Sequence, residues 1–202
     1  TIKINATNQK DILNTEKLGD INLIDTGEIE DDDEEVDINE ILETVADIEE
    51  LEIESKIALI YDRASGNILY EKNGNKQTHM ASTTKIMTAI VVLENSNLSD
   101  VVTIDSKAAG TGGSRLGLKK NDKITVNDLL YGLMLRSGND AAVALANYVG
   151  GSIDGFADMM NNKARELGLV NSHFIVPHGL DNDGHYTTAY ELAKMADYAL
   201  KI

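Results

Sequence analysis

Ser82 and Lys85 form a Ser-x-x-Lys pair at the predicted start of an apolar helix. Residues three apart lie on one face of a helix, with Cβ atoms about 5–6 Å apart. A serine hydroxyl becomes a strong nucleophile when a base takes its proton, and a lysine can be that base if burial lowers the pKa of its amine. The backbone N–H groups of a helix start favour developing negative charge. The pair therefore indicates a serine/lysine acyl-transfer centre.

Ser137 and Asn139 form a second motif, Ser-x-Asn, at a break between two predicted helices. A loop there can present both side chains to a substrate. The hydroxyl can relay a proton between Lys85 and a leaving amine, and the carboxamide can bind a substrate amide or orient the lysine. Taken singly, each motif also fits a structural role: a capping serine followed by a surface lysine, and a helix terminus followed by an N-cap asparagine.

The elements that would position these residues follow from the hydropathy pattern. Residues 56–62 and 67–71 predict a β-hairpin. Residues 82–94 predict a helix with apolar side chains on nearly every face, which is typical of a buried helix. A short strand at 101–104 and a glycine-containing loop at 110–116 follow.

Further helices are predicted over 125–136, 139–148, 152–167 and 188–200, with an extended segment at 173–176. Thr125 with Asp128, and Thr188 with Glu191, resemble capping boxes. Methionines sit at helical core spacings and are expected to pack in the interior: Met134, Met159, Met160 and Met195. The pattern indicates a helix-rich α+β or α/β domain.

Charge divides the chain of 202 residues in two. Residues 1–55 hold 19 of the 34 acidic residues and three lysines, which accounts for the net charge of −16. Residues 56–202 hold 15 acidic and 15 basic residues. We therefore expect an acidic, disordered leader over residues 1–55 and a neutral domain over residues 56–202. The charge distribution disfavours nucleic-acid binding.

Composition excludes several classes of protein. The chain has no cysteine, which rules out disulfide and cysteine-based metal or redox sites. It contains no apolar run long enough for a transmembrane helix. It begins with threonine and has no basic and apolar leader, so we expect a mature or cut fragment.

The two motifs together match the signature of penicillin-interacting serine enzymes. Longer stretches resemble the low-molecular-mass penicillin-binding proteins, which are the serine-type D-Ala-D-Ala carboxypeptidases of bacterial cell walls. From about Ile57 to Leu200 these stretches follow the family's order: residues 80–89, 135–142, 171–174, 177–180 and 185–193. The resemblance implies an α+β, β-lactamase/transpeptidase-like fold in which a helical cluster packs against an antiparallel sheet.

The resemblance also implies roles for the matching residues. Ser82 would form an acyl-enzyme with the penultimate D-Ala carbonyl of a peptidoglycan stem peptide, and Lys85 would accept its proton. Ser137 would pass a proton to the departing D-Ala. Asn139 would contact the substrate backbone, and Ser114, in the loop at 110–116, would lie near the substrate. Water would hydrolyse the ester, with no metal or cofactor.

One family motif is missing. Neither Lys-Thr-Gly nor Lys-Ser-Gly occurs in the sequence, although family members carry this motif on a strand that lines the active site. We therefore expect that the chain is truncated before the motif, that the sheet is incomplete, and that this piece has reduced activity. A membrane anchor, if the protein has one, would lie outside this chain.

Four histidines, His79, His173, His178 and His185, are expected to be structural or surface residues. Their spacing misses the pairing of helical zinc sites. The family resemblance places the protein in the bacterial cell envelope, outside the cytoplasm, with β-lactam antibiotics as inhibitors that acylate Ser82. Two alternatives stay open: a β-lactamase-like hydrolase, and a non-catalytic module that binds peptidoglycan or β-lactams.

Overall fold

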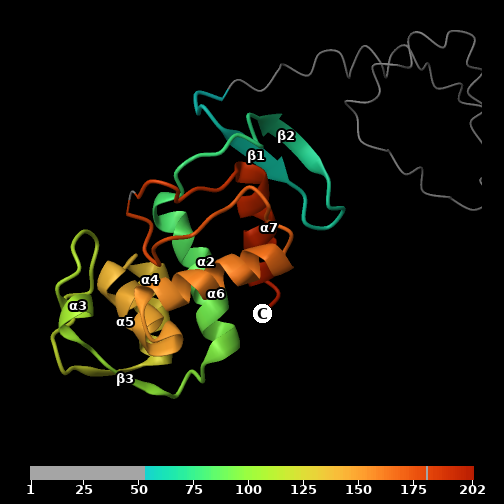
Figure 1. Cartoon of the computed structure of the whole chain (residues 1–202). Helices are drawn as coiled ribbons and strands as arrows, with labels where there is room; N and C mark the ends of the chain where they lie inside the picture. The colour runs from blue at the N-terminus through green and yellow to red at the C-terminus, as the bar shows by residue number, and fades with distance from the viewer. Residues whose placement is uncertain (1–52, 181) are drawn as a thin grey trace, which may run out of the picture. The chain divides into compact units, whose positions relative to one another are not determined.

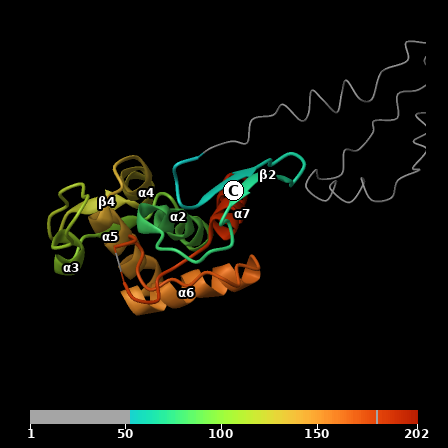
Figure 2. The ribbon, with the colours of Figure 1, turned by 90° about the horizontal axis from the view of Figure 1, so that it is seen from above.

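The computed structural model describes residues 53–180 and 182–202, and its compact unit is Ser55–Ile202 (Figures 1 and 2). The predicted acidic leader lies almost entirely outside the described residues and stays a prediction. The described part combines helices with two antiparallel sheets of two strands each. The α+β class is therefore confirmed.

The first sheet is the predicted hairpin. β1 (Ala58–Tyr61) pairs with β2 (Ile68–Lys72), with Ala58 opposite Lys72 and an irregularity after Ile60. The Asp62 carboxylate closes the turn by accepting hydrogen bonds from the amides of Ala64 and Ser65. Such side-chain acceptance is typical of aspartate at a turn start.

The second sheet contains one strand that the sequence analysis missed. β3 (Val101–Thr103) pairs with β4 (Lys123–Thr125). The short helix α3 (Ser106–Ala109), also missed, begins at Asp105, whose side chain accepts from the Ala108 amide. β4 has a single apolar residue, Ile124, and a helix of four residues is too short for hydrophobic periodicity to reveal.

The longer helices match their predicted ranges closely. A 3-10 turn, η2 (Ala81–Thr83), leads into α2 (Thr84–Asn95). The others are α4 (Val126–Leu135), α5 (Asn139–Gly150), α6 (Ile153–Glu166) and α7 (Ala189–Ala199). Thr125 and Thr188 accept hydrogen bonds from the amides three residues on, as the capping boxes predict.

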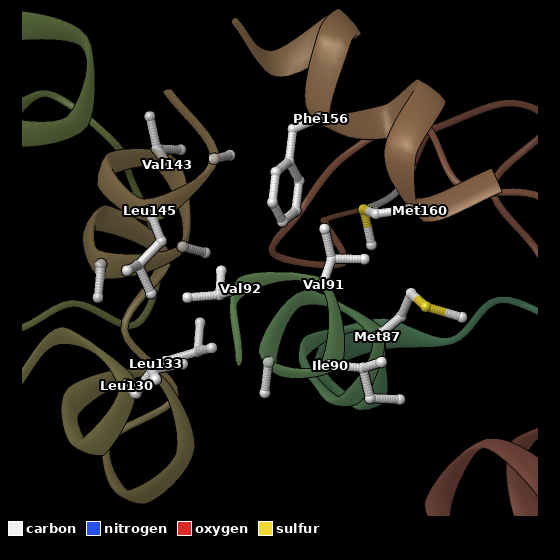
Figure 3. Packing of buried hydrophobic residues seen from close by; sticks show 14 of the residues in the cluster. Met87, Ile90, Val91, Val92, Leu130, Leu133, Val143, Leu145, Phe156 and Met160 are labelled. Carbon is white, nitrogen blue, oxygen red and sulfur yellow. The ribbon is translucent and has the colours of Figure 1, made fainter. Parts of the chain in front are cut away.

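The buried helix α2 organises the core. In both views it lies between α7 with the hairpin on one side and α4 with α5 on the other (Figures 1 and 2). Figure 3 shows Val91 and Val92 of α2 among side chains from the surrounding helices, including Leu145 of α5 and Phe156 of α6. Burying each such side chain stabilises the fold by about 1.5–3 kcal/mol.

Most of the predicted packing methionines are in the interior. Met160 and Met195 are fully buried, and Met159 packs against the core. The prediction for Met134 is wrong, because its side chain is 51% exposed on α4. This exposed position adjoins Leu135, which is also exposed. In the residues that the structure describes, no helix is long and apolar enough to cross a membrane.

Candidate active site

Ser82 and Lys85 meet at the start of α2. Ser82 lies in the exposed 3-10 turn, and the Lys85 amine lies 3.1 Å from its hydroxyl oxygen. The lysine is only 2% exposed, although it carries an ionisable group. Because burial disfavours the charged form, the pKa of Lys85 falls to about 8. The sequence-based expectation of a buried lysine with a lowered pKa is thus met by the geometry.

Ser137 reaches the same point from the connection between α4 and α5. Its hydroxyl donates a hydrogen bond to the Ser82 oxygen at 2.9 Å. Ser137 has a φ of 53°, and Ala81, the residue before Ser82, has a φ of 47°. Left-handed backbone at such residues costs about 1–3 kcal/mol and concentrates at functional sites. Lys85, Ser82 and Ser137 therefore form a continuous hydrogen-bonded path along which a proton can move.

Asn139 and Ser114 lie beside this group. Asn139 is 4% exposed, and its side-chain amide donates to the Gly112 carbonyl at 2.9 Å. Its backbone N–H donates to the Ser114 carbonyl at 2.7 Å. Asn139 therefore holds the loop at 112–114 against the start of α5, while Ser114 itself is exposed. The contacts between Asn139 and this loop join residues about 25 positions apart, so the Ser-x-Asn motif alone does not predict them.

Two polar contacts near the site were not foreseen. The His178 carbonyl accepts a hydrogen bond from the Lys85 amine at 2.7 Å. The buried Asp140 carboxylate accepts from the backbone amides of Leu116, Gly117 and Leu118 at 2.9–3.1 Å. His178 falls in the stretch 177–180 that carried part of the family resemblance. Asp140 falls in the stretch 135–142, which also carried part of the resemblance, but its contacts with the loop were not predicted.

The histidines have structural contacts. His185 is buried, and its ring nitrogens contact the Thr84 hydroxyl and the Ile175 amide. His173 Nδ1 contacts the Gly184 carbonyl at 2.7 Å. Burial lowers the pKa of both His178 and His185 to about 4. The charge of Lys85 lowers the pKa of His178 further, and the charge of His178 does the same to His185. Within residues 53–180 and 182–202, no group of three or more candidate ligands could hold a metal ion.

Comparison with protein families matches residues 43–202 to the family described as D-alanyl-D-alanine carboxypeptidase. The chain belongs to this family. Among its curated relatives, the carboxypeptidase DacF of Bacillus subtilis is 43% identical over 157 residues, which cover 75% of this chain and 40% of the relative. DacC of Escherichia coli is 39% identical over 157 residues, covering 72% of this chain and 39% of the relative.

Solved structures confirm the transpeptidase-like fold. The carboxypeptidase DacD from Francisella tularensis superposes with a TM-score of 0.72 at 38% identity, covering 74% of this chain and 38% of the other. Penicillin binding protein 5 from Haemophilus influenzae gives a TM-score of 0.72 at 32% identity, covering 75% and 46% respectively. The chain thus spans about 40% of the length of the curated relatives it matches.

Proposed function

We propose that this chain carries the nucleophile-bearing part of a serine-type D-Ala-D-Ala carboxypeptidase, with residues 56–202 as the N-terminal portion of the catalytic domain. The observation that carries the proposal is the position of the Ser82 oxygen, which lies 3.1 Å from the Lys85 amine and 2.9 Å from the Ser137 hydroxyl. A nucleophile within hydrogen-bond reach of its base is the geometry that covalent catalysis requires. The family names of the relatives supply the reaction.

In the first half of the reaction, Ser82 Oγ attacks the carbonyl of the penultimate D-Ala of a peptidoglycan stem peptide. The neutral Lys85 amine accepts the hydroxyl proton and becomes an ammonium. As the peptide bond breaks, Ser137 passes its own proton to the nitrogen of the terminal D-Ala and regains one from the Lys85 ammonium, so that Lys85 is neutral again. Free D-Ala leaves and an ester on Ser82 remains.

In the second half, water attacks the ester and the shortened peptide is released. Asn139, two residues after Ser137, would contact the peptide backbone, and Ser114, whose carbonyl accepts from the Asn139 backbone amide, would lie near the substrate. Neither half requires a metal or a cofactor. A β-lactam would acylate the same serine, in keeping with the similarity to penicillin binding protein 5 from Haemophilus influenzae. The substrate places the protein in the bacterial cell envelope, outside the cytoplasm.

The test is release of D-Ala from diacetyl-Lys-D-Ala-D-Ala, measured for the chain and for Ser82→Ala. We expect slow release by the first, which lacks the Lys-Thr-Gly motif, and none by the second, because the ester cannot form without the hydroxyl. Equal release by Ser82→Ala would contradict the proposal. Turnover of penicillin without turnover of the peptide would favour a β-lactamase-like hydrolase. Peptide that binds and is recovered unchanged would favour a binding module.

A further inference from the structure

A turn far from Lys85 in sequence lies directly against the start of α2. The Pro177 carbonyl accepts a hydrogen bond from the Thr88 hydroxyl at 2.7 Å, and the His178 carbonyl accepts from the Lys85 amine at 2.7 Å. These contacts come from two residues of α2 that are three positions apart, and so from one face of the helix. The turn at 177–180 is thus attached to the face that carries Lys85.

Gly179 allows this close approach. It has a φ of 83°, and a Cβ at this position would lie 1.8 Å from the Ala81 carbonyl oxygen and 2.8 Å from the Thr84 hydroxyl. Backbone cannot yield to such an overlap as a flexible side chain could. Any residue other than glycine would therefore push the turn away from η2 and from Lys85.

A buried histidine fixes the same region from its other side. His185 Nδ1 accepts from the Ile175 amide at 3.0 Å, which places the ring proton on Nε2. Nε2 then donates to the Thr84 hydroxyl at 2.8 Å, and that hydroxyl donates to the Ala81 carbonyl at 2.8 Å. The segment before the turn and the residues around Ser82 are held by one hydrogen-bonded chain.

The contact with His178 also orients the lysine. A neutral amine has two hydrogens and one lone pair. When one hydrogen donates to the His178 carbonyl, the lone pair can point to the Ser82 hydroxyl at 3.1 Å and accept its proton. The same turn helps to keep Lys85 out of water.

We propose that the turn at 177–180 is a positioning element for acylation, in which the His178 carbonyl orients the Lys85 amine and Gly179 lets the turn close over it. The inference rests on the proposed function in one respect, that Lys85 is the base.

Few other groups near Lys85 titrate close to neutral pH. The His178 imidazole faces it from the turn, and its Nδ1 accepts from the Leu180 amide at 3.1 Å, so the ring is neutral above about pH 4. His185, attached to Thr84, behaves in the same way. From the other side the site is faced by the hydroxyls of Ser82 and Ser137, while the Asp140 carboxylate is turned to the amides of 116–118. A titration near pH 8 therefore reports on Lys85 itself.

The test compares Gly179→Ala with Gly168→Ala. Gly168 also has a positive φ, of 70°, but a Cβ there would meet nothing within 4 Å. Competitive acetylation of lysines across a pH series, read by peptide mass spectrometry, gives the pKa of Lys85 without any substrate. We expect the pKa of Lys85 to rise from about 8 in Gly179→Ala, because the amine regains water. It should stay near 8 in Gly168→Ala. Each increase of one unit in the pKa of Lys85 leaves about tenfold less neutral amine at pH 7 and therefore slows acylation about tenfold.

A second variant covers the case in which Gly179→Ala does not fold. Thr88→Val keeps the side-chain volume and removes the hydrogen bond to Pro177, so we expect a smaller rise in the pKa of Lys85. A Lys85 pKa that stays near 8 in the folded variants would overturn the proposal. If the pKa rises but the wild-type chain neither reacts with benzylpenicillin nor releases D-Ala, the turn shields Lys85 from water, but the proposed function fails and the role of the turn in acylation fails with it.

Discussion

Lys85 combines two properties that rarely coincide, a charged side-chain type and an environment that excludes water. Lysine is almost never fully buried unless it is paired, yet within the part of the chain that the structure describes its amine donates hydrogen bonds to two neutral oxygens, those of Ser82 and His178. The lowered pKa follows from this environment. Helical spacing was sufficient to predict that Ser82 and Lys85 meet. The meeting of Ser137 with Ser82, 55 positions away, was predicted from the resemblance to penicillin-interacting serine enzymes.

The pH dependence of acylation tests the role of Lys85. Below pH 8 the amine is mostly protonated and cannot accept a proton, whereas above it the amine is mostly neutral. We expect the rate of acylation by benzylpenicillin to rise about tenfold per pH unit from pH 6 and to level off above about pH 9. Lys85→Arg keeps a cation that does not titrate in this range, so acylation should fall at least about a hundredfold and lose the rise. A wild-type rate that is constant from pH 6 to 9 would refute this assignment.

Elements of the fold meet around the site through contacts between distant segments. Helix starts, helix lengths and the first hairpin could be predicted from capping residues and hydrophobic periodicity. The positions of the loops could not, because they depend on long-range hydrogen bonds. The start of α5 illustrates this: Asn139 holds the loop at 112–114, and Asp140 holds the amides of 116–118. The same holds for the turn at 177–180.

The Asp140 contacts predict a specific loss of stability. Asp140→Asn replaces one acceptor oxygen by an N–H₂ group that faces backbone N–H donors, so partly buried amides of residues 116–118 lose their acceptor. We expect the free energy of unfolding to fall by about 1–3 kcal/mol, measured by urea unfolding with an unchanged m-value. Asp154→Asn is the control, since Asp154 occupies the first turn of α6 but is exposed. Equal decreases in the free energy of unfolding for Asp140→Asn and Asp154→Asn would show that the hydrogen bonds of Asp140 do not stabilise the fold.

At the scale of the whole molecule, one buried helix is surrounded by four others and carries the site at its N-terminal end. The apolar character of residues 84–92 predicted this arrangement. The sequence also shows that the net negative charge comes from residues 1–55, because the acidic and basic residues of 56–202 balance. Its stability should therefore depend on pH mainly through buried groups, His178 and His185 above all.

That dependence has a definite sign. Both histidines have a folded-state pKa of about 4, below the unfolded value of 6.5, so the unfolded chain binds more protons between these values. Stability is complete above about pH 6.5 and is lost as the pH falls towards 4. We expect the free energy of unfolding to be about 3–4 kcal/mol lower at pH 5 than at pH 7, roughly half of it from each histidine. His185→Gln should reduce this difference in free energy between pH 5 and pH 7. His173→Gln, which replaces an exposed histidine, should not reduce it. Equal stability of the wild-type chain at both pH values would contradict the prediction.

The central claim is that Ser82 is a nucleophile activated by Lys85 and Ser137. The most direct measurement is the intact mass of the 202-residue chain after incubation with benzylpenicillin. Ser82→Ala is compared with Ser96→Ala, which alters the serine at the other end of the same helix. We expect one penicilloyl group per chain in the wild type and in Ser96→Ala, and none in Ser82→Ala. A wild-type chain that stays unmodified, or an adduct that persists in Ser82→Ala, would contradict it.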